Sequence, residues 1–412
     1  MTPEIILFTI LAIVVFNTFF EQILEFLNLK SENAPIPAEL NGIYSDEEFL
    51  KAKSYHKDLF NFHSISAYVS LVFTLIVLKG GYVGKLDSWV NTLFESELYK
   101  FLFLFGLAFL VSDVLSLPFQ LYHTFVIEQK YGFNKSTVGL FFIDKIKSYV
   151  LGGLVGGILV GVLFILIQKL GPDFWWIFWL IMAVFMIGLN MFYTSLIIPL
   201  FNKLTPLEDG KLKDLITEYC AKVDFPLSNI FVIDGSKRSS KANAFFSGIG
   251  KQKKVVFYDT LLKNHTEEEL LAIFAHEVGH YKRKHVYLNI LIGLGQVGFM
   301  LFMMSKFIFS NDLSAALGAE RVSYAVNVWA FTMLFTPISL LIGIVFNMIS
   351  RKNEYEADDY AKNTTNGNDL ADALKKLSEK NLSNLNPHSL YVFVHYSHPP
   401  MLARLRNLKK QN

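Results

Sequence analysis

Three side chains in the second half of the chain are of the types that hold and use a catalytic metal. The sequence from Thr266 runs Thr-Glu-Glu-Glu-Leu-Leu-Ala-Ile-Phe-Ala-His-Glu-Val-Gly-His and ends in His276, Glu277 and His280. Thr266 with Glu269 makes a capping box, and the apolar residues recur at helical spacing, so a helix is predicted. Two histidines four residues apart on a helix project from one face and can bind one zinc ion.

The glutamate beside the first histidine suits metal-assisted hydrolysis. Zinc lowers the pKa of a bound water toward about 7, and Glu277 can take the proton of that water and later pass it to the leaving amine. The alternative interpretation is two helix-surface histidines beside a solvated glutamate. The single cysteine, Cys220, rules out a zinc site built on several cysteines and is more simply a packed small hydrophobe.

A catalytic zinc usually keeps three protein ligands, so a third ligand must come from elsewhere in the chain. The stretch from Ser350 predicts a helix that carries four acids, Glu354, Glu356, Asp358 and Asp359. Helical spacing places Glu354 and Asp358 on one face, where one can bind the metal and the other can accept the outer N–H of a ligand histidine. Glu356 and Asp359 fit a solvated helix face. Spacing alone leaves the choice of ligand open among the four acids.

A last polar cluster near the C-terminus is His395-Tyr-Ser-His398-Pro-Pro-Met-Leu-Ala-Arg404. A histidine and an arginine near a zinc ion can stabilise the oxyanion of a tetrahedral intermediate or bind a C-terminal carboxylate. Taken alone, a histidine before two prolines is more often a turn residue.

The elements that position these residues belong to a membrane protein. A chain that is 52% hydrophobic and 15% aromatic falls in the membrane class. A net charge of +2, from 38 basic and 36 acidic residues, is too balanced to indicate a nucleic-acid partner. A crossing helix needs about 20 mostly apolar residues, which predicts seven spans, near 4–25, 60–80, 99–127, 148–169, 174–200, 286–309 and 325–349.

Two features of the spans bear on their environment. Asp113 and Pro118 lie inside the third span, which favours a water-filled cavity, the alternative being one aspartate hydrogen-bonded to a neighbouring helix. Basic residues are concentrated in alternate loops. This asymmetry predicts an N-terminus outside and a C-terminus in the cytoplasm, with the segments 201–285 and 350–412 on the cytoplasmic side.

The predicted organisation is therefore a bundle of helices interrupted by a divided polar domain. Residues 1–200 hold five spans and 286–349 hold the last two. Residues 201–285 carry the histidine helix, and 350–412 carry the third ligand. Within the first polar segment, 229–233 and 254–258 are predicted strands because β-branched and aromatic residues dominate them. A small strand pair beside a site can hold an extended peptide by edge addition.

Several motifs together resemble those of the integral-membrane CAAX prenyl endopeptidases. These are the type I CAAX proteases, a family of membrane zinc metalloproteases. The motifs are His276-Glu-Val-Gly-His280, Ser350-Arg-x-x-Glu354-x-x-Ala-Asp358, Ser397-His398-Pro-Pro and Asn243-Ala-Phe-Phe. Similarity also extends to Thr124-Phe-Val-Ile-Glu-x-Lys-Tyr-Gly-Phe-Asn-Lys and Pro199-Leu-Phe-Asn-Lys-Leu-Thr-Pro-Leu, and so covers nearly the whole chain.

This resemblance implies an all-α multi-pass membrane protein whose seven transmembrane helices enclose a chamber. It also implies a gluzincin-like zinc metalloprotease domain with a small β element. His276, His280 and Glu354 would bind one Zn²⁺ per chain, with Asp358 behind them. Glu277 would act as the base, His398 and Arg404 would stabilise the transition state or bind the substrate, and Asn243 would contact the substrate backbone.

The implied reaction removes the last three residues of a prenylated CAAX protein. The alternative is a bacterial membrane-protein quality-control zinc protease of broader specificity. Expected partners are prenylated or membrane-associated protein substrates and membrane lipid, and no nucleic acid. The predicted location is a bacterial inner membrane or the endoplasmic reticulum membrane. The C-terminal Lys409-Lys410 has the spacing of a retrieval signal, although a solvated basic end is the simpler interpretation.

Overall fold

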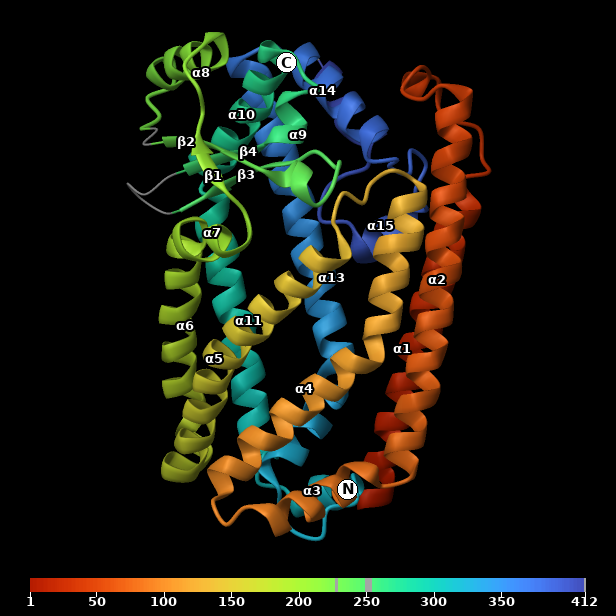
Figure 1. Cartoon of the computed structure of the whole chain (residues 1–412), viewed down its shortest axis with the longest axis vertical. Helices are drawn as coiled ribbons and strands as arrows, with labels where there is room; N and C mark the ends of the chain where they lie inside the picture. Colours follow the sequence, from red (N-terminus) through yellow and green to blue (C-terminus); the bar gives the residue numbers. More distant parts are fainter. Residues whose placement is uncertain (227–228, 249–253, 411–412) are drawn as a thin grey trace.

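The computed structural model describes residues 1–226, 229–248 and 254–410. In Figure 1 the two termini lie at opposite ends of the longest axis, and the strands gather with α8, α10 and α14 at the end that holds the C-terminus. The helices are α1 Pro3–Ser31, α2 Asp46–Lys79, α3 Tyr82–Leu93, α4 Glu97–Tyr122, α5 Val138–Leu170, α6 Phe174–Phe192, α7 Ile198–Phe201, α8 Lys211–Lys222, α9 Asp259–Leu262, α10 Glu267–Lys282, α11 His285–Phe307, α12 Asn311–Ala316, α13 Tyr324–Thr364, α14 Gly367–Lys380, α15 Ser389–His395 and α16 Met401–Lys409.

Within the described residues, six helical segments are long and apolar enough to cross a membrane. One of them, 138–201, is 64 residues long, and it contains both α5 and α6. The two helices are separated by a short 3₁₀ turn, Gly171–Asp173, in which Gly171 has a positive φ of 55° that a glycine adopts without steric cost. The seven predicted spans therefore correspond to α1, α2, α4, α5, α6, α11 and α13, and the predicted fold class is confirmed.

Several helices extend beyond their apolar part. Helix α2 begins at Asp46, where Ser45 and Glu48 form a capping box, well before the predicted span. Helix α13 runs without a break from Tyr324 to Thr364. It therefore carries the predicted third metal ligand on the same rigid element as the last crossing.

The sheet has four strands in the order β1-β2-β4-β3. Its strands are β1 Leu204–Pro206, β2 Asn229–Ile233, β3 Ala244–Ser247 and β4 Lys254–Tyr258. Strands β2 and β4 are those predicted from the sequence, and they pair in parallel, while β1 and β3 add to them antiparallel. Strand β3 forms one edge of the sheet and contacts α10. Buried side chains of β4, α8, α10 and α14 share one hydrophobic core.

The aspartate inside the third span is paired with a neighbouring helix. Asp113 of α4 lies 2.8 Å from the Lys145 ammonium of α5, and it accepts a hydrogen bond from Tyr149. Gln120, two turns along α4, accepts a second hydrogen bond from Lys145. The structure thus gives Asp113 a partner on a neighbouring helix, and the water-filled cavity stays a prediction.

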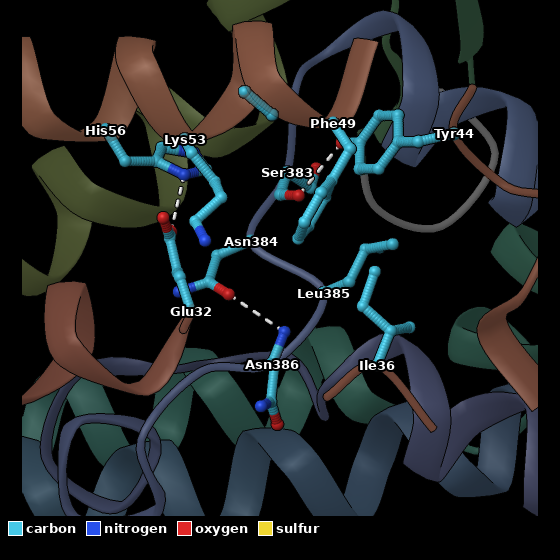
Figure 2. Close-up of a pocket in the computed structure, with 11 residues that line it drawn as sticks. Glu32, Ile36, Tyr44, Phe49, Lys53, His56, Ser383, Asn384, Leu385 and Asn386 are labelled. Carbon is cyan, nitrogen blue, oxygen red and sulfur yellow. Dashed lines mark hydrogen bonds and ion pairs between the residues drawn. The ribbon is translucent and has the colours of Figure 1, made fainter. Parts of the chain in front are cut away.

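The N-terminal helices are attached to the C-terminal segment at a small pocket of about 10 Å³, shown in Figure 2. Glu32, at the end of α1, forms an ion pair of 2.5 Å with His56 of α2. Nearby, the hydroxyl of Tyr44 donates to the carbonyl oxygens of Ser378 and Ser383. A space of this size holds about one water molecule, so this seam serves packing between distant parts of the chain.

Candidate metal centre

Helix α10 presents the two histidines from its last turns. Thr266 and Glu269 cap the helix reciprocally, as predicted. The helix is buried along most of its length, which fixes the backbone that carries His276 and His280. The two imidazole rings lie with centroids 4.8 Å apart, and their Nε2 atoms are 3.1 Å apart.

The third side chain arrives because α10 and α13 approach closely. At Gly279 an added Cβ would lie only 3.0 Å from the Ala357 Cα, so glycine and alanine allow the two backbones to meet here. Glu354 lies almost one turn before Ala357 on α13. It is 4% exposed, and its carboxylate faces both imidazoles.

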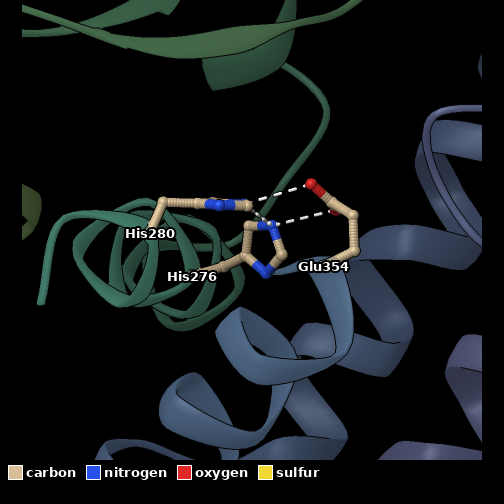
Figure 3. A group of neighbouring side chains, drawn as sticks. All are labelled: His276, His280 and Glu354. Carbon is tan, nitrogen blue, oxygen red and sulfur yellow. Dashed lines mark hydrogen bonds and ion pairs between the residues drawn. The ribbon is translucent and has the colours of Figure 1, made fainter. Parts of the chain in front are cut away.

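The three side chains meet in the arrangement shown in Figure 3. One ligand atom from each of His276, His280 and Glu354 lies within 4.8 Å of the others. The carboxylate oxygens are 3.4 Å from the His276 Nε2 and 3.1 Å from the His280 Nε2. Ligand atoms about 2.0–2.1 Å from a tetrahedral zinc ion are separated by about 3.3 Å. The 3.1 Å between the two Nε2 atoms is close to this separation, and each imidazole lies at a similar distance from one of the two carboxylate oxygens.

One carboxylate oxygen at this point also fits a metal. The Glu354 Oε2 is buried and makes no hydrogen bond among the described residues, its charged neighbours being the His276 Nε2 at 3.4 Å and the Arg404 Nη1 at 3.8 Å. Burying a carboxylate oxygen without a partner is costly. A cation bound between the two imidazoles and this carboxylate would satisfy that oxygen, and two imidazoles with one carboxylate are a donor set that suits zinc.

Glu277 lies beside the three ligand atoms and is partly buried. None of the described residues hydrogen-bonds to its carboxylate, so its oxygens are free to hold a water. Burial raises the pKa of the Glu277 carboxyl above its ordinary value, although the neighbouring imidazoles of His276 and His280 oppose the shift. A carboxyl with a raised pKa holds an accepted proton more readily, which suits a group that accepts and then returns a proton.

Asp358 supports the first histidine from behind. Its side chain is fully buried and accepts a hydrogen bond from the His276 Nδ1 at 2.9 Å. Arg404 of α16 donates to both oxygens of Asp358, at 2.9 and 2.5 Å, and so compensates the buried charge. Burial alone would lower the pKa of His276, but its contacts with the carboxylates of Asp358 and Glu354 outweigh burial and raise the pKa to about 9. A metal that binds the Nε2 of His276 competes with a proton for that atom.

His398 also lies close to the Glu354 carboxylate, and it is more exposed than the two ligand candidates His276 and His280. Its Nε2 is 3.4 Å from the Glu354 carboxylate, and 63% of its side chain is exposed. The segment that carries it is fixed by α13: Arg351 donates to the carbonyls of Val392 and Tyr396, at the end of α15. From the sequence, Arg351 was known only as part of a motif. The structure shows that it holds the segment before His398 against α13.

Asn243 is placed apart from this group. It is exposed, directly precedes β3, and its side-chain oxygen accepts a hydrogen bond from the Ala244 N–H. It lines a pocket of about 450 Å³ together with Arg238, Phe245 and Tyr258. Its predicted contact with a substrate backbone remains a prediction.

One site residue was missed by the sequence analysis. His285, the first residue of α11, is 3% exposed, and its Nδ1 lies 3.1 Å from the Nδ1 of His280. The only signal available was a third histidine five residues after the second, which is not a spacing that places side chains on one helical face.

Comparisons with known proteins show the family to which the chain belongs. A family model described as CAAX prenyl protease N-terminal, five membrane helices, matches residues 25–203. A second, Peptidase family M48, matches residues 206–412, half of the chain, and this range includes His276, His280 and Glu354. The chain belongs to peptidase family M48. The resemblance inferred from the motifs is thus confirmed, and this M48 chain is a multi-pass membrane metallopeptidase.

Relatives of this M48 peptidase align along most of its length. The probable CAAX prenyl protease 1 of Schizosaccharomyces pombe is 38% identical, over 91% of this chain and 83% of the relative. The CAAX prenyl protease 1 homolog of Arabidopsis thaliana is 34% identical, over 97% of this chain and 96% of the relative. The crystal structure of S. mikatae Ste24p superposes with a TM-score of 0.93 at 32% identity, over 98% of this chain and 99% of that one.

Proposed function

We propose that this chain is a zinc-dependent membrane endopeptidase that removes the C-terminal tripeptide from prenylated CAAX proteins. The observation that carries the proposal is the group of ligand atoms from His276, His280 and Glu354 beside the unpaired carboxylate of Glu277. Relatives that are named CAAX prenyl proteases align with nearly the whole chain, which supports the same substrate class. They also disfavour the alternative, a quality-control protease of broader specificity.

The three ligands would hold one zinc ion per chain and leave a fourth position open. When bound, the zinc supplies a water of lowered pKa and polarises the scissile carbonyl. Glu277 takes the proton of the attacking water and returns it to the leaving amine. Its raised pKa suits this double role, because the carboxyl must keep the proton between the two steps.

The remaining site residues orient the reacting groups. Asp358 holds the Nδ1–H of His276, so that the Nε2 of that ring is the free ligand atom. Arg404 neutralises Asp358, and its Nη1 is also 3.8 Å from Glu354. His398, close to the Glu354 carboxylate, is positioned to donate to the oxyanion or to the substrate. Asn243 would contact the substrate backbone.

The substrate and the membrane define the expected setting of the enzyme. Its partners would be prenylated or membrane-associated proteins and membrane lipid. The loop charges support an N-terminus outside and a C-terminus in the cytoplasm, with the metal centre on the cytoplasmic side. Protease protection of sealed membrane vesicles, read with tags on each terminus, tests this orientation.

The substrate proposal is tested by mass spectrometry of peptide products. A peptide ending in a prenylated cysteine and three further residues, and its unprenylated counterpart, are incubated with the purified protein. We expect release of the intact tripeptide from the prenylated peptide, with no product after chelation of the metal or in Glu277→Gln. Equal cleavage of both peptides at several internal sites would favour the broader protease instead.

A further inference from the structure

A pair of side chains outside the predicted ligand set contacts the second histidine. The imidazole of His285 lies between His280 and Glu356. Its Nδ1 is 3.1 Å from the His280 Nδ1, and its Nε2 is 3.1 Å from a carboxylate oxygen of Glu356. His285 is 3% exposed, whereas 37% of the Glu356 side chain is exposed. The three groups form a line from the metal centre to the surface of the domain.

Hydrogen-bond chemistry fixes the protons along this line. When His280 binds a metal through its Nε2, its Nδ1 carries the hydrogen and must donate. The Nδ1 of His285 must then accept, which leaves the hydrogen of a neutral His285 on its Nε2. That Nε2–H points to the Glu356 carboxylate, which only accepts when ionised. The contacts are therefore mutually consistent in a single arrangement of tautomers.

The backbone is shaped to bring His285 to this position. Lys284, between α10 and α11, has a φ of 61°, a left-handed conformation that is uncommon for a lysine. This residue turns the chain so that the first residue of α11 faces back toward the last turn of α10. Such uncommon conformations persist where the surrounding structure requires them, and they occur often at functional sites.

The two ligand histidines are thus supported differently. The Nδ1 of His276 meets the carboxylate of Asp358 directly, at 2.9 Å. The Nδ1 of His280 meets another imidazole, which in turn meets a carboxylate. On the outer side, Lys352 lies 3.7 Å from the second oxygen of Glu356, and so the carboxylate has a cation on its solvent side.

We propose that His285 and Glu356 are positioning residues that hold His280 in the tautomer and orientation that bind the metal. This inference rests on the proposed zinc site. His285 accepts the Nδ1–H of His280, and Glu356 keeps the accepting Nδ1 of His285 free of hydrogen. Partners of this kind behind a ligand typically change metal affinity by about 10–100-fold when they are removed.

The test is the zinc affinity of the full-length protein in detergent, measured by competition with a chromophoric chelator. His285→Leu removes the acceptor, whereas His285→Asn keeps a side-chain oxygen near the place of the Nδ1. We expect zinc affinity to fall by about 10–100-fold in His285→Leu and to recover most of that loss in His285→Asn. Wild-type affinity in His285→Leu, or equal losses in both variants, would overturn the proposal, because equal losses indicate packing alone.

A second pair of variants keeps the test decisive if a change at the buried histidine prevents folding. Glu356→Ala alters a partly exposed side chain, and Asp359→Ala is its matched control. Asp359 is an acid on the same helix with 45% of its side chain exposed, and it contacts Lys362 and Asn407 instead. We expect weaker zinc binding in Glu356→Ala and unchanged binding in Asp359→Ala. Equal zinc affinities in these two variants would overturn the proposed positioning role of Glu356.

The wild-type protein separates this inference from the proposed function. If the wild type binds one zinc ion and cleaves its substrate, and the His285 and Glu356 variants keep wild-type zinc affinity, only the positioning role of these two residues is refuted. A wild type that binds no zinc refutes the proposed function itself.

Discussion

The close approach of α10 and α13 at Gly279 leads to a specific prediction for Gly279→Ala. The new Cβ would lie 3.0 Å from the Ala357 Cα and 3.1 Å from both the Ala357 oxygen and the Tyr360 Cβ. Ordinary contacts begin at 3.4 Å, so the helices must separate by about 0.4 Å or more. Overpacking of this kind costs about 1–3 kcal/mol, while replacing a helical glycine by alanine returns about 1 kcal/mol. The net loss of stability is therefore small.

The metal centre is expected to be affected as well as folding. Gly279 lies next to His280, and Ala357 lies three residues after Glu354, so a separation of the helices acts directly on the ligand distances. A separation of about 0.4 Å or more takes up nearly all of the roughly 0.5 Å within which such ligand groups must be held. We therefore predict that zinc affinity falls by about tenfold or more, by analogy with other changes behind metal ligands.

The assay compares zinc affinity and thermal unfolding of Gly279→Ala with those of a matched control. Gly295→Ala, in α11, makes the same change where an added Cβ would find nothing within 4 Å. The control should keep wild-type zinc affinity. Wild-type zinc affinity and turnover in Gly279→Ala would refute the argument that this helix contact sets the ligand geometry.

Three further predictions concern the side chains of the site. Glu277→Gln should keep stoichiometric zinc and lose hydrolysis, because the base is removed and no ligand is; retained turnover would exclude Glu277 from the mechanism. His398→Ala should lower kcat by about 10²-fold if it donates in the transition state, whereas an unchanged kcat with a raised KM would reassign it to binding. Asp358→Ala should cost up to about 3–5 kcal/mol in chemical unfolding, since the buried Arg404 loses both hydrogen bonds to Asp358 and is left with the Glu354 carboxylate at 3.8 Å; unchanged stability would show that water compensates Arg404.

Much of the fold could be predicted because membrane-spanning helices and strands rich in β-branched and aromatic residues have a distinctive local composition. The strands at 229–233 and 254–258 were found from their composition, while β1 and β3 were not, since three or four residues carry too little pattern. Hydropathy also marks the apolar part of a helix rather than its full extent. For that reason the span at 325–349 and the helix from Ser350 were predicted as separate elements and not as the single helix α13, and the sequence did not show that α2 begins at Asp46.

The metal centre was accessible to sequence reasoning as far as helical spacing reaches. The i, i+4 spacing paired His276 with His280 and Glu354 with Asp358, and the structure buries both acids of that second pair. Spacing could not choose the ligand, because the choice depends on where α10 meets α13. His285 was missed for a related reason. Its contact with His280 depends on a left-handed lysine, Lys284, which no residue preference predicts.

The central claim is that three side chains from α10 and α13 bind one zinc ion. Anomalous diffraction at the zinc edge from crystals of the purified, active protein tests it most directly. We predict a single strong peak within about 2.0–2.2 Å of the Nε2 atoms of His276 and His280 and of the Glu354 carboxylate. A peak away from these atoms, or a fully active protein that holds no metal, would contradict the account.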